Sequence, residues 1–512
     1  MSKLEKYSHM GRKIIFIMTD TQRTDMVGCY GYPEMKTPSI DALAAKGVRY
    51  DRAYSCQPVC GPARSAIFTG TYPHSNGAWG NSMPLGANVK TVGQRLSDNR
   101  FHTAYVGKYH LDGGDYFGLG VAADGWDPDY WYDMKNYLDE LSTEERYKSR
   151  QTETMETENW PQEKTFAHRV SNKAIAFLEN HQEDDYFLVV SYDEPHDPFI
   201  CPEPFASMYK DYEFPKSENI WDDLENKPDL LKAWAGKSLE ADKDALRIMP
   251  QYFLGCNSFV DHEIGRVLEK IEEVAPDALI IYTSDHGDAL HSHSLQAKGP
   301  SMYDEIARIP LIIYDPKSTS PGGSVCPHPA SHIDLTPTIL DYAGIRQPKL
   351  LEGISMRPMI EDPGHKMHAY IFTEFNRYEV DHDGFGGFQP MRACYDGRYK
   401  LSLFLLSQDE MYDLESDPYE MHNLIDSAHH QEIRKRLHDA ILDWMNQTRD
   451  PFRGYYWERR PWREDARPAT WDYTGYTRQR ENEEYEPRQL NYSTGLVMEA
   501  AVRKKKDLDD PS

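Results

Sequence analysis

The chain has 512 residues, with 83 acidic and 57 basic side chains and a formal net charge of −26. This acidity argues against a nucleic-acid or anionic-membrane surface, since both need clustered lysine and arginine. An anionic substrate would need a local basic pocket. No apolar run approaches the roughly 18 residues of a membrane helix. The apolar run at residues 14–18 is too short for a signal-peptide core, so the sequence as given predicts a cytoplasmic protein.

The first predicted strand covers residues 14–18 and runs straight into the polar residues 19–22. In an open α/β sheet, ligands bind at the carboxyl ends of the strands. Asp20 therefore lies where a metal ligand would be useful. The alternative role is a helix N-cap, and this residue alone does not separate the two.

Cys60 begins the pattern Cys-x-Pro-x-Arg-x4-Thr-Gly, which ends at Gly70. The pattern predicts a helix that starts at the cysteine, with the Arg64 guanidinium facing it, and such a helix N-terminus attracts anions. The other six cysteines show no paired spacing, so we interpret them as buried small hydrophobes without a disulfide framework. Thiol chemistry alone does not explain the proline and the arginine at these offsets.

The strand predicted at residues 102–106 also ends in functional side chains, Lys108 and His110. Positions i and i+2 leaving a strand point to one side, so both could face one site. The glycine-rich loop that follows contains Asp112, Asp115 and Tyr116. These residues either contact substrate or form turns, and turns are the favoured interpretation.

Two later strands, predicted at residues 187–191 and 278–282, repeat this arrangement. Each is an apolar run with titratable side chains after its carboxyl end. These side chains are His196 after the first strand, Asp285 and His286 after the second, and Lys298 further along the chain. Taken singly, a histidine after a strand is more often a structural residue, and Asp-His-Gly turns are common.

Three segments are candidates for the substrate-binding wall: residues 72–81, 112–115 and 374–379. They mix aromatic, amide and charged side chains, which suit a hydroxyl-rich sugar. The candidate residues are Trp79, Asn81, Asp112, Asn376 and Arg377. The alternative for the last segment is a connection between subdomains.

Strands alternate with helices up to about residue 365, with a helical surface insertion near residues 130–164. This order predicts an α/β fold, a large and mostly parallel sheet sandwiched by helices, over residues 1–365. Beyond it, Asp396-Gly397 between two apolar runs signals a hairpin. We therefore expect a smaller antiparallel α+β subdomain over residues 366–448.

The tail at residues 449–512 is rich in aromatic and basic side chains. We expect it to pack on its own subunit or on a neighbouring copy, which would make the protein a homo-oligomer. Its last residues are predicted to be disordered.

The pattern at Cys60 resembles the maturation signature of the type I sulfatases, the formylglycine-dependent branch of the alkaline phosphatase-like superfamily. Residues 411–424 resemble the closing motif of that family, so the resemblance spans residues 13–424. It implies a maturation enzyme that oxidises Cys60 to formylglycine, whose hydrate is the nucleophile. The implied reaction is hydrolysis of a sulfate monoester, on a small molecule or an oligosaccharide, to alcohol and inorganic sulfate through a covalent sulfo-enzyme.

The resemblance also implies a role for each strand-end residue. Arg64 and Lys108 would hold the nucleophile and its charge, and Lys298 would bind the sulfate oxygens. His196 would protonate the leaving oxygen, and His110 would take the proton that releases sulfate. The implied ligands of one divalent metal ion are Asp20, Cys60, Asp285 and His286.

Two positions depart from the family pattern. Many sulfatases have a second aspartate where this chain has Thr21, and an asparagine where it has His286. Ca²⁺ is the metal that the family implies, but an imidazole and one fewer carboxylate favour Mn²⁺ or Zn²⁺. Gln22 or a backbone oxygen could replace the missing carboxylate as a metal ligand.

The Asp-His pair also resembles phosphonate monoester hydrolases, formylglycine relatives that cleave phosphorus esters. The sequence thus leaves a phosphonate monoester or phosphodiester hydrolase as the alternative activity. A non-catalytic binder of sulfated glycans, in which Cys60 is never matured, is the third interpretation. The two lysines favour sulfate, since a sulfate monoester needs several cations around one terminal group.

Overall fold

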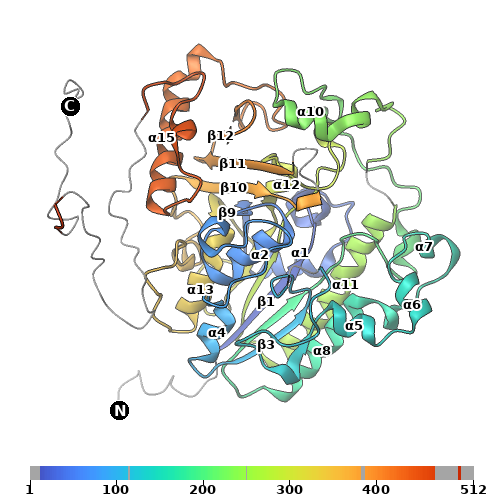
Figure 1. The fold of residues 1–512 in the computed structure, drawn as a ribbon. Helices are drawn as coiled ribbons and strands as arrows, with labels where there is room; N and C mark the ends of the chain where they lie inside the picture. The colour runs from blue at the N-terminus through green and yellow to red at the C-terminus, as the bar shows by residue number, and fades with distance from the viewer. Residues whose placement is uncertain (1–11, 114–115, 249–250, 382–386, 467–493, 497–512) are drawn as a thin grey trace.

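The structure, a computed structural model, describes residues 12–113, 116–248, 251–381, 387–466 and 494–496. Its main feature is a nine-stranded sheet with the order β4-β3-β5-β1-β6-β8-β2-β7, which β9 joins through β2 (Figure 1). The central strands are parallel to one another. They are β3 (His102–Gly107), β5 (Tyr186–Ser191), β1 (Lys13–Thr19) and β6 (Leu279–Ser284).

Helices cover both faces of this sheet. The side chains of β1 are therefore buried on both sides of the strand. Ile15 and Ile17 face one core with α1 (Pro38–Lys46), α8 (Phe166–Asn180) and α11 (Gln251–Val274). Ile14 and Phe16 face a second core with α2 (Cys60–Thr69), α4 (Val92–Ser97) and α13 (Leu335–Tyr342). Figure 1 shows these two helical layers. The predicted helix–sheet–helix sandwich is confirmed.

Further strands and helices complete this part of the molecule. The strands are β2 (Val48–Tyr54), β4 (Trp131–Tyr132), β7 (Arg308–Ile309), β8 (Leu311–Tyr314) and β9 (Ser324–Ser331). The helices are α3 (Pro73–Asn76), α5 (Met134–Asp139), α6 (Thr143–Lys148), α7 (Thr154–Thr157), α9 (Phe205–Met208), α10 (Asp229–Ala235), α12 (Asp304–Ala307) and α14 (Arg357–Glu361). The helical insertion predicted near residues 130–164 contains α5 to α7.

Strand β9 is absent from the sequence prediction because it contains Pro327 and Pro329, which cannot donate to a sheet ladder. Among the described residues β9 pairs with β2 alone, so one side of the strand needs no partner and tolerates both prolines. Pro310 separates β7 from β8.

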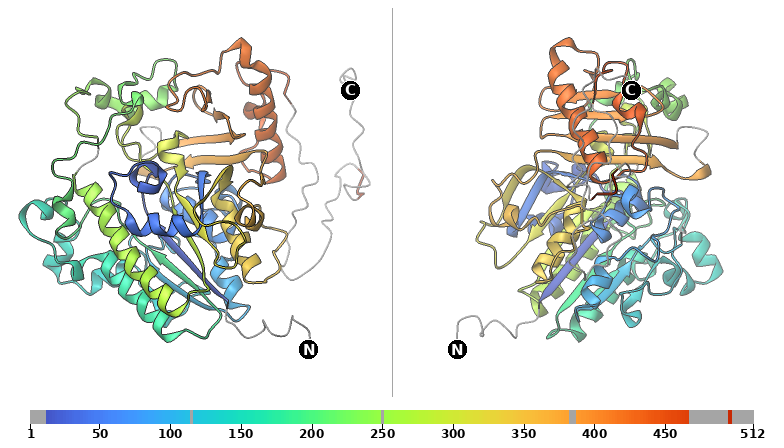
Figure 2. Two further views of the ribbon diagram at one scale, coloured as in Figure 1. Left: turned by 180° about the vertical axis from the view of Figure 1, so that it is seen from behind. Right: turned by 60° about the vertical axis from the view of Figure 1, so that its left-hand side comes forward.

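A second, antiparallel sheet forms a separate layer beyond the large sheet (Figure 2). It contains β10 (Ile371–Arg377), β11 (Phe388–Tyr395), β12 (Tyr399–Phe404) and β13 (Glu410–Asp413), and α15 (Gln431–Gln447) packs on it. The hairpin between β11 and β12 turns at Gly397 with φ +104°. The predicted hairpin is confirmed. Strand β10 extends to Arg377, so Asn376 and Arg377 lie within a strand of the second sheet and not in a connection between subdomains.

The first part of the tail packs on the second sheet of its own chain. Trp457 of α16 (Tyr455–Glu458) is buried in one apolar cluster with Leu401 and Trp444. Arg460 pairs with Asp409 at 2.7 Å. Residues 467–493 and 497–512 lie outside the described residues, so the contact with a neighbouring copy and the disordered end stay predictions, as does the three-part division of the chain.

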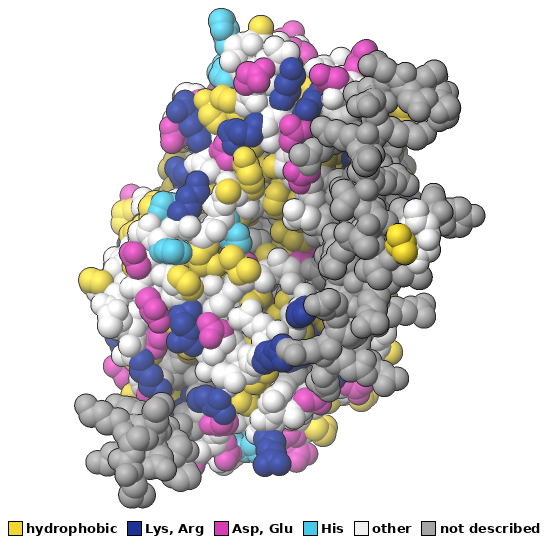
Figure 3. Space-filling model, turned by 90° about the vertical axis from the view of Figure 1, so that its left-hand side faces the viewer, with side chains coloured by type: hydrophobic (Ala, Val, Ile, Leu, Met, Phe, Trp, Pro, Cys, Tyr) yellow, Lys and Arg dark blue, Asp and Glu magenta, His cyan; other side chains and the backbone are white. Residues whose placement is uncertain are grey.

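The face of the molecule in Figure 3 carries charges of both signs. The described lysine and arginine side chains on it are interspersed with aspartate and glutamate. Within the described residues, every helix is too short or too polar to cross a membrane.

Candidate active site

The predicted site residues converge because four parallel strands end in register. Met18 of β1 lies opposite Ser191 of β5 and Thr283 of β6, and Gly107 of β3 lies opposite Ser191. The loops that follow therefore leave one edge of the sheet at the same level. Helix α2 begins at this edge with Cys60, directly after the extended residue Val59.

Four side chains form a buried group that could hold a metal ion: Asp20, Cys60, Asp285 and His286, with ligand atoms all within 4.8 Å of one another. The Cys60 sulfur lies 3.1 Å from His286 Nε2 and 3.7 Å from Asp20 Oδ1. His286 Nε2 is 3.7 Å from Asp285 Oδ1. The sequence proposed these four residues together, and the structure brings them together.

His286 has the tautomer that a metal ligand needs. Its Nδ1 lies 2.7 Å from the carbonyl oxygen of Gly287, an arrangement that places the proton on Nδ1. Nε2 is then the ring nitrogen that faces Cys60 and the two carboxylates. Burial and the neighbouring Asp20 raise the pKa of Asp285 to about 6. Because one carboxylate raises the pKa of the other, a cation between them would relieve their repulsion.

Thr21 takes part in this group through its hydroxyl, which donates to Asp20 Oδ1 at 2.7 Å. Its backbone has φ +66°, a strained conformation for a β-branched residue. Gln22 does not face the group, because its amide nitrogen donates to Asn257 and its oxygen accepts from Tyr282. The suggestion that Gln22 replaces the missing aspartate is therefore not supported by its contacts.

Arg64 is fully buried and connects both carboxylates. Its Nε donates to Asp285 Oδ2 and its Nη2 donates to Asp20 Oδ2, each at 3.0 Å. The third nitrogen donates to the Lys108 carbonyl and to the Ser191 hydroxyl. Burial lowers the pKa of Arg64, but the two carboxylates outweigh it and raise that pKa on balance. The arginine thus fixes the two carboxylates of the candidate metal group beside Cys60.

Lys108 points into the same site and bridges two carboxylates. Its Nζ lies 2.8 Å from Asp20 Oδ2 and 3.0 Å from Asp193 Oδ1, and the side chain is fully buried. Burial raises the pKa of Cys60, as does Asp20, but Lys298, Lys108 and His286 outweigh both, and that pKa falls well below its usual value. The site thus favours an anion at position 60.

His196 and Lys298 contact each other in the same site. Lys298 Nζ lies 3.1 Å from His196 Nε2, and His196 Nδ1 lies 2.8 Å from Asp197 Oδ1. Burial, Lys298 and Lys108 lower the pKa of His196, whereas Asp20 and the hydrogen bond to Asp197 raise it, on balance to about 10. His196 thus carries a proton at neutral pH.

His110 is held in a left-handed backbone conformation with φ +59° and is buried. Burial lowers its pKa, although a hydrogen bond with Cys60 opposes that effect. A neutral imidazole beside position 60 can accept a proton. Its Nδ1 is buried without a hydrogen-bond partner among the described residues.

Two predicted substrate residues, Trp79 and Asn81, lie in the loop that follows α3. Asn81 Oδ1 accepts from the Gly61 backbone nitrogen at 3.0 Å, which ties this loop to the start of α2. The Asn81 nitrogen donates to the carbonyl of Tyr378 at 2.7 Å. The Trp79 ring packs edge-on against Phe452 at 5.8 Å.

The other predicted substrate residues differ in exposure. Asn376 is fully buried, and its amide bonds to Glu374 and Arg392. Arg377 is half-buried with its guanidinium 4.9 Å from the Phe388 ring. Asp112 Oδ2 accepts from the backbone of Leu119. Asp115 lies outside the described residues, and the substrate-binding roles of the others stay predictions.

Three residues to which the sequence analysis gave no catalytic role complete the site: Tyr116, Asp193 and Asp197. Asp193 and Asp197 flank His196 in one strand-end loop. Their position beside a candidate acid is the feature of the sequence from which a role for these two carboxylates could have been predicted. For Tyr116 the sequence favours a turn. Its hydroxyl donates to Asp193 Oδ1 at 2.5 Å, and only the fold brings these two loops together.

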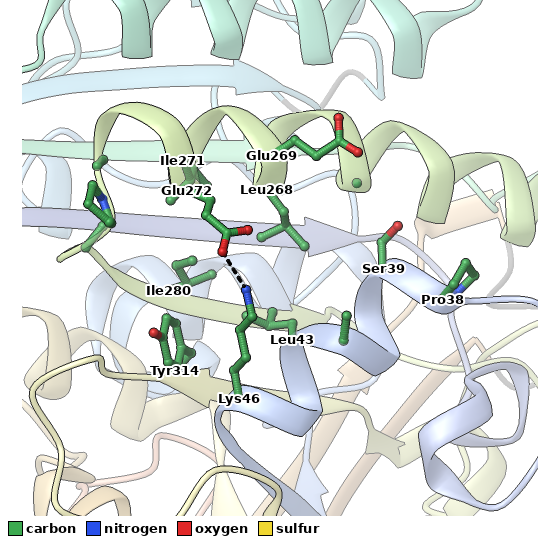
Figure 4. Close-up of a pocket in the computed structure, with 15 residues that line it drawn as sticks. Pro38, Ser39, Leu43, Lys46, Leu268, Glu269, Ile271, Glu272, Ile280 and Tyr314 are labelled. Carbon is green, nitrogen blue, oxygen red and sulfur yellow. Dashed lines mark hydrogen bonds and ion pairs between the residues drawn. The ribbon is translucent and has the colours of Figure 1, made fainter.

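A separate cavity of about 370 Å³ lies between α1 and α11 (Figure 4). Leu43, Ile271 and Ile280 supply apolar walls, and Lys46 donates to Glu272 at 3.2 Å. None of the described residues that line this cavity is a predicted site residue. We therefore place the chemistry at the strand ends and not in this cavity.

Comparison with known proteins gives the family. The family model described as sulfatase matches residues 12–345, and the model described as N-sulphoglucosamine sulphohydrolase, C-terminal, matches residues 295–447. The chain belongs to the sulfatase family and is a sulfuric ester hydrolase. This membership implies, in general terms, a metal ion and a formylglycine.

Individual relatives agree with this assignment. The uncharacterized sulfatase YidJ of Escherichia coli (strain K12) is 44% identical over 94% of this chain and 96% of that protein. An N-acetylglucosamine-6-O-sulfatase of Bacteroides thetaiotaomicron is 27% identical over 85% of this chain and 87% of that protein. The crystal structure of a phosphonate monoester hydrolase of Agrobacterium radiobacter superposes with a TM-score of 0.73 at 22% identity, over 85% of this chain and 96% of that one, which shows the shared fold.

Proposed function

We propose that this enzyme hydrolyses a sulfate monoester on a carbohydrate, with a formylglycine derived from Cys60 as the source of the nucleophile. The observation that carries the proposal is the meeting of two cations and two histidines around position 60. Lys108 and Lys298 would neutralise the terminal oxygens of the sulfate group, and a terminal sulfate presents three of them. His110 and His196 would then handle the two proton transfers of the reaction.

The pair formed by Lys298 and His196 supports the role of His196 as an acid. When the imidazole is protonated, Nε2 and the lysine Nζ are both donors, yet they lie 3.1 Å apart. Two donors at this distance need a shared acceptor. The ester oxygen of a bound sulfate would supply that acceptor, and the proton on Nε2 would pass to it as the alcohol leaves.

His110 would act in the second half of the reaction. Its pKa is lowered by burial, so the imidazole is neutral and can accept a proton at neutral pH. Its position beside residue 60 suits it to take the proton whose removal releases inorganic sulfate. The two histidines thus have opposite pKa shifts that match opposite roles.

Asp20, Asp285 and His286 would hold one divalent metal ion beside position 60. Such an ion lowers the pKa of a hydroxyl near it by several units, which would activate the formylglycine hydrate. One imidazole among two carboxylates favours Mn²⁺ or Zn²⁺ over the Ca²⁺ that the resemblance implies. Removal of the metal with a chelator should abolish activity. The activity recovered on addition of Mn²⁺, Zn²⁺ or Ca²⁺ should then show which ion the site uses best.

The names of several relatives support a carbohydrate as the substrate. One relative is an N-acetylglucosamine-6-O-sulfatase, and the matched C-terminal family model carries the name of an N-sulphoglucosamine sulphohydrolase. The loop with Trp79 and Asn81 lies beside Tyr378 at the edge of the site. Aromatic and amide side chains of this kind suit a sugar ring with several hydroxyl groups.

The second candidate is a phosphonate monoester or phosphodiester hydrolase on the same fold. His286 in the metal group favours it, since the Asp-His pair resembles that class. Lys108 and Lys298 favour sulfate, because a diester has fewer charged terminal oxygens to neutralise. A non-catalytic sulfated-glycan binder would need none of the proton-transfer groups.

The test begins with mass spectrometry of the Cys60 peptide, in which formylglycine is about 18 Da lighter than cysteine. The matured protein is then assayed on a panel of sulfated mono- and oligosaccharides, on an aryl sulfate and on a phenyl phosphonate monoester. We expect the highest kcat/KM on a sulfated sugar. A preference for the phosphonate would select the second candidate, and an unmodified, inactive protein from a host with maturation machinery would select the binder.

A further inference from the structure

Tyr116 touches several of the groups to which the proposed function gives a role. Its hydroxyl donates to Asp193 Oδ1 at 2.5 Å and lies 3.3 Å from His196 Nδ1. Its ring lies 3.9 Å from Lys108 Nζ. One side chain therefore contacts the residue that faces the nucleophile and the residue that would protonate the leaving group.

The ring of Tyr116 is fixed from several directions. The guanidinium of Arg150, from the helical insertion, lies 5.5 Å from the ring centroid, on which Lys108 also packs. The His110 ring packs against it edge-on at 5.7 Å. These contacts leave the ring little freedom to turn, so its hydroxyl has a defined direction.

Asp193 connects the hydroxyl to the lysine. The same oxygen, Oδ1, accepts from Tyr116 and from Lys108 Nζ. Asp193 is only 5% exposed, so these two donors rather than water satisfy that oxygen. Arg150 approaches the other carboxylate oxygen to 3.8 Å. A shift of the tyrosine would therefore disturb the lysine as well.

We propose that Tyr116 is a positioning residue that holds the His196 ring and the Lys108 ammonium in place relative to each other. The inference rests on the proposed function, from which the roles of these two residues come. Because the hydroxyl gives its proton to Asp193, its oxygen is left to accept from His196 Nδ1. Together with Asp197, this acceptor turns Nε2 toward Lys298 and the leaving oxygen.

The variant Tyr116→Phe isolates the hydroxyl, since it keeps the ring under Lys108. We expect kcat on a sulfate ester with a poor leaving group, such as an alkyl or sugar sulfate, to fall about 10-fold or more. On p-nitrophenyl sulfate the loss should stay below about 3-fold, because that leaving group needs little protonation. KM should change little for either substrate.

The pH profile gives a second readout that simple packing would not move. The charged and titratable groups that face His196 are Lys298, Lys108, Asp20, Asp197 and Tyr116. Loss of one acceptor for the Nδ1 proton destabilises the protonated ring. The basic limb of kcat/KM should therefore move to lower pH by about 0.5 in Tyr116→Phe.

Tyr137→Phe is the matched control. Tyr137 is also buried, and its hydroxyl donates to the carbonyl of Lys164 at 2.8 Å, away from the strand ends. Its removal should leave both the leaving-group dependence and the pH profile unchanged. Tyr116→Leu removes the ring as well, and we expect it to add a loss of similar size on both substrates, since Lys108 loses its support.

Equal losses on both esters in Tyr116→Phe, or an unmoved basic limb, would overturn the positioning role. Failure of the proposed function looks different, because the wild-type protein would then lack sulfatase activity. If the wild type cleaves phosphonate monoesters instead, the same comparison across good and poor leaving groups on phosphonates tests Tyr116 directly.

Discussion

The two halves of the site hold their charges in different ways. The nucleophile half, defined by Asp20, Cys60, Arg64, Asp285 and His286, is at most 1% exposed at every position. The leaving-group half, defined by Tyr116, Asp193, His196, Asp197 and Lys298, is more open: the His196 side chain is 14% exposed and that of Asp197 is 69% exposed. The first half is a closed ion network, whereas the second faces solvent through its loops.

This difference separates two tasks. In the nucleophile half, each charge compensates another, and removal of one partner leaves a buried charge unpaired, which is costly. Under the proposed function that half would act on the sulfate group, which is common to all sulfate esters. The leaving-group half must serve alcohols of different shape and acidity, and its importance should depend on the substrate. Variants in the two halves should therefore fail in different ways.

The largest effect is expected for Cys60→Ala, in the nucleophile half. Without a residue that can be matured, kcat should fall at least about 10⁴-fold on every sulfate ester, whatever its leaving group. The measurement is kcat on an aryl sulfate and on a sugar sulfate. Cys56→Ala is the matched control, because Cys56 is buried four positions earlier and contacts Ser331. Retained turnover in Cys60→Ala would contradict the assignment of the nucleophile.

The next effect concerns His196→Ala, in the leaving-group half. We expect a loss of about 10²–10⁴-fold on a sugar sulfate, because general acid catalysis is worth that much when the alcohol leaves poorly. On p-nitrophenyl sulfate the loss should be below about 10-fold. A plot of log kcat against leaving-group pKa should become steeper. If both substrates lost the same factor, His196 would belong to the first half and not to the second.

A smaller effect is expected from Asp197→Asn, measured as a pH profile. An acid must be protonated to work, so activity is present below the pKa of His196 and is lost as pH rises through about 10. Asp197 raises that pKa through its hydrogen bond, so the variant should lose activity at a lower pH than the wild type. Asp184→Asn, which breaks the His181–Asp184 pair outside the site, is the control and should leave the profile unchanged.

The same division explains what the sequence could predict. The carboxyl ends of the strands can be predicted from the sequence, because a short apolar run indicates each strand. The polar residue after the run then lies at the edge of the sheet where ligands bind. Asp20, Lys108, His196 and Asp285 were found in this way. Their convergence depends on four strands in register, which the alternation of strands and helices implies for a parallel sheet.

Contacts between loops were beyond the sequence. Tyr116 meets Asp193 because β3 and β5 are neighbours, yet 77 positions separate the two residues. Strand β9 was absent from the prediction because its prolines argue against a strand unless one edge is known to be unpaired. The burial of Asn376 likewise follows from Arg392 on the neighbouring strand, a pairing that no local pattern marks.

The smallest effects distinguish two adjacent residues of β10 that were predicted together as substrate contacts. Asn376 is fully buried and bonds to Arg392 and Glu374, so Asn376→Ala should lower the free energy of unfolding by about 1–2 kcal/mol and leave KM unchanged. Arg377 is half-buried at the end of the strand, next to Tyr378, whose carbonyl binds the Asn81 loop.

Arg377→Ala should therefore raise KM for a sulfated sugar by about 5-fold, equivalent to about 1 kcal/mol, with kcat unchanged. KM for p-nitrophenyl sulfate should stay the same, since a small aryl ester does not extend as far as Arg377 at the end of β10. Urea unfolding and steady-state kinetics on the two variants separate the cases. A KM effect in Asn376→Ala without loss of stability would show that its amide leaves the buried network to bind substrate, and would extend the leaving-group half into the second sheet.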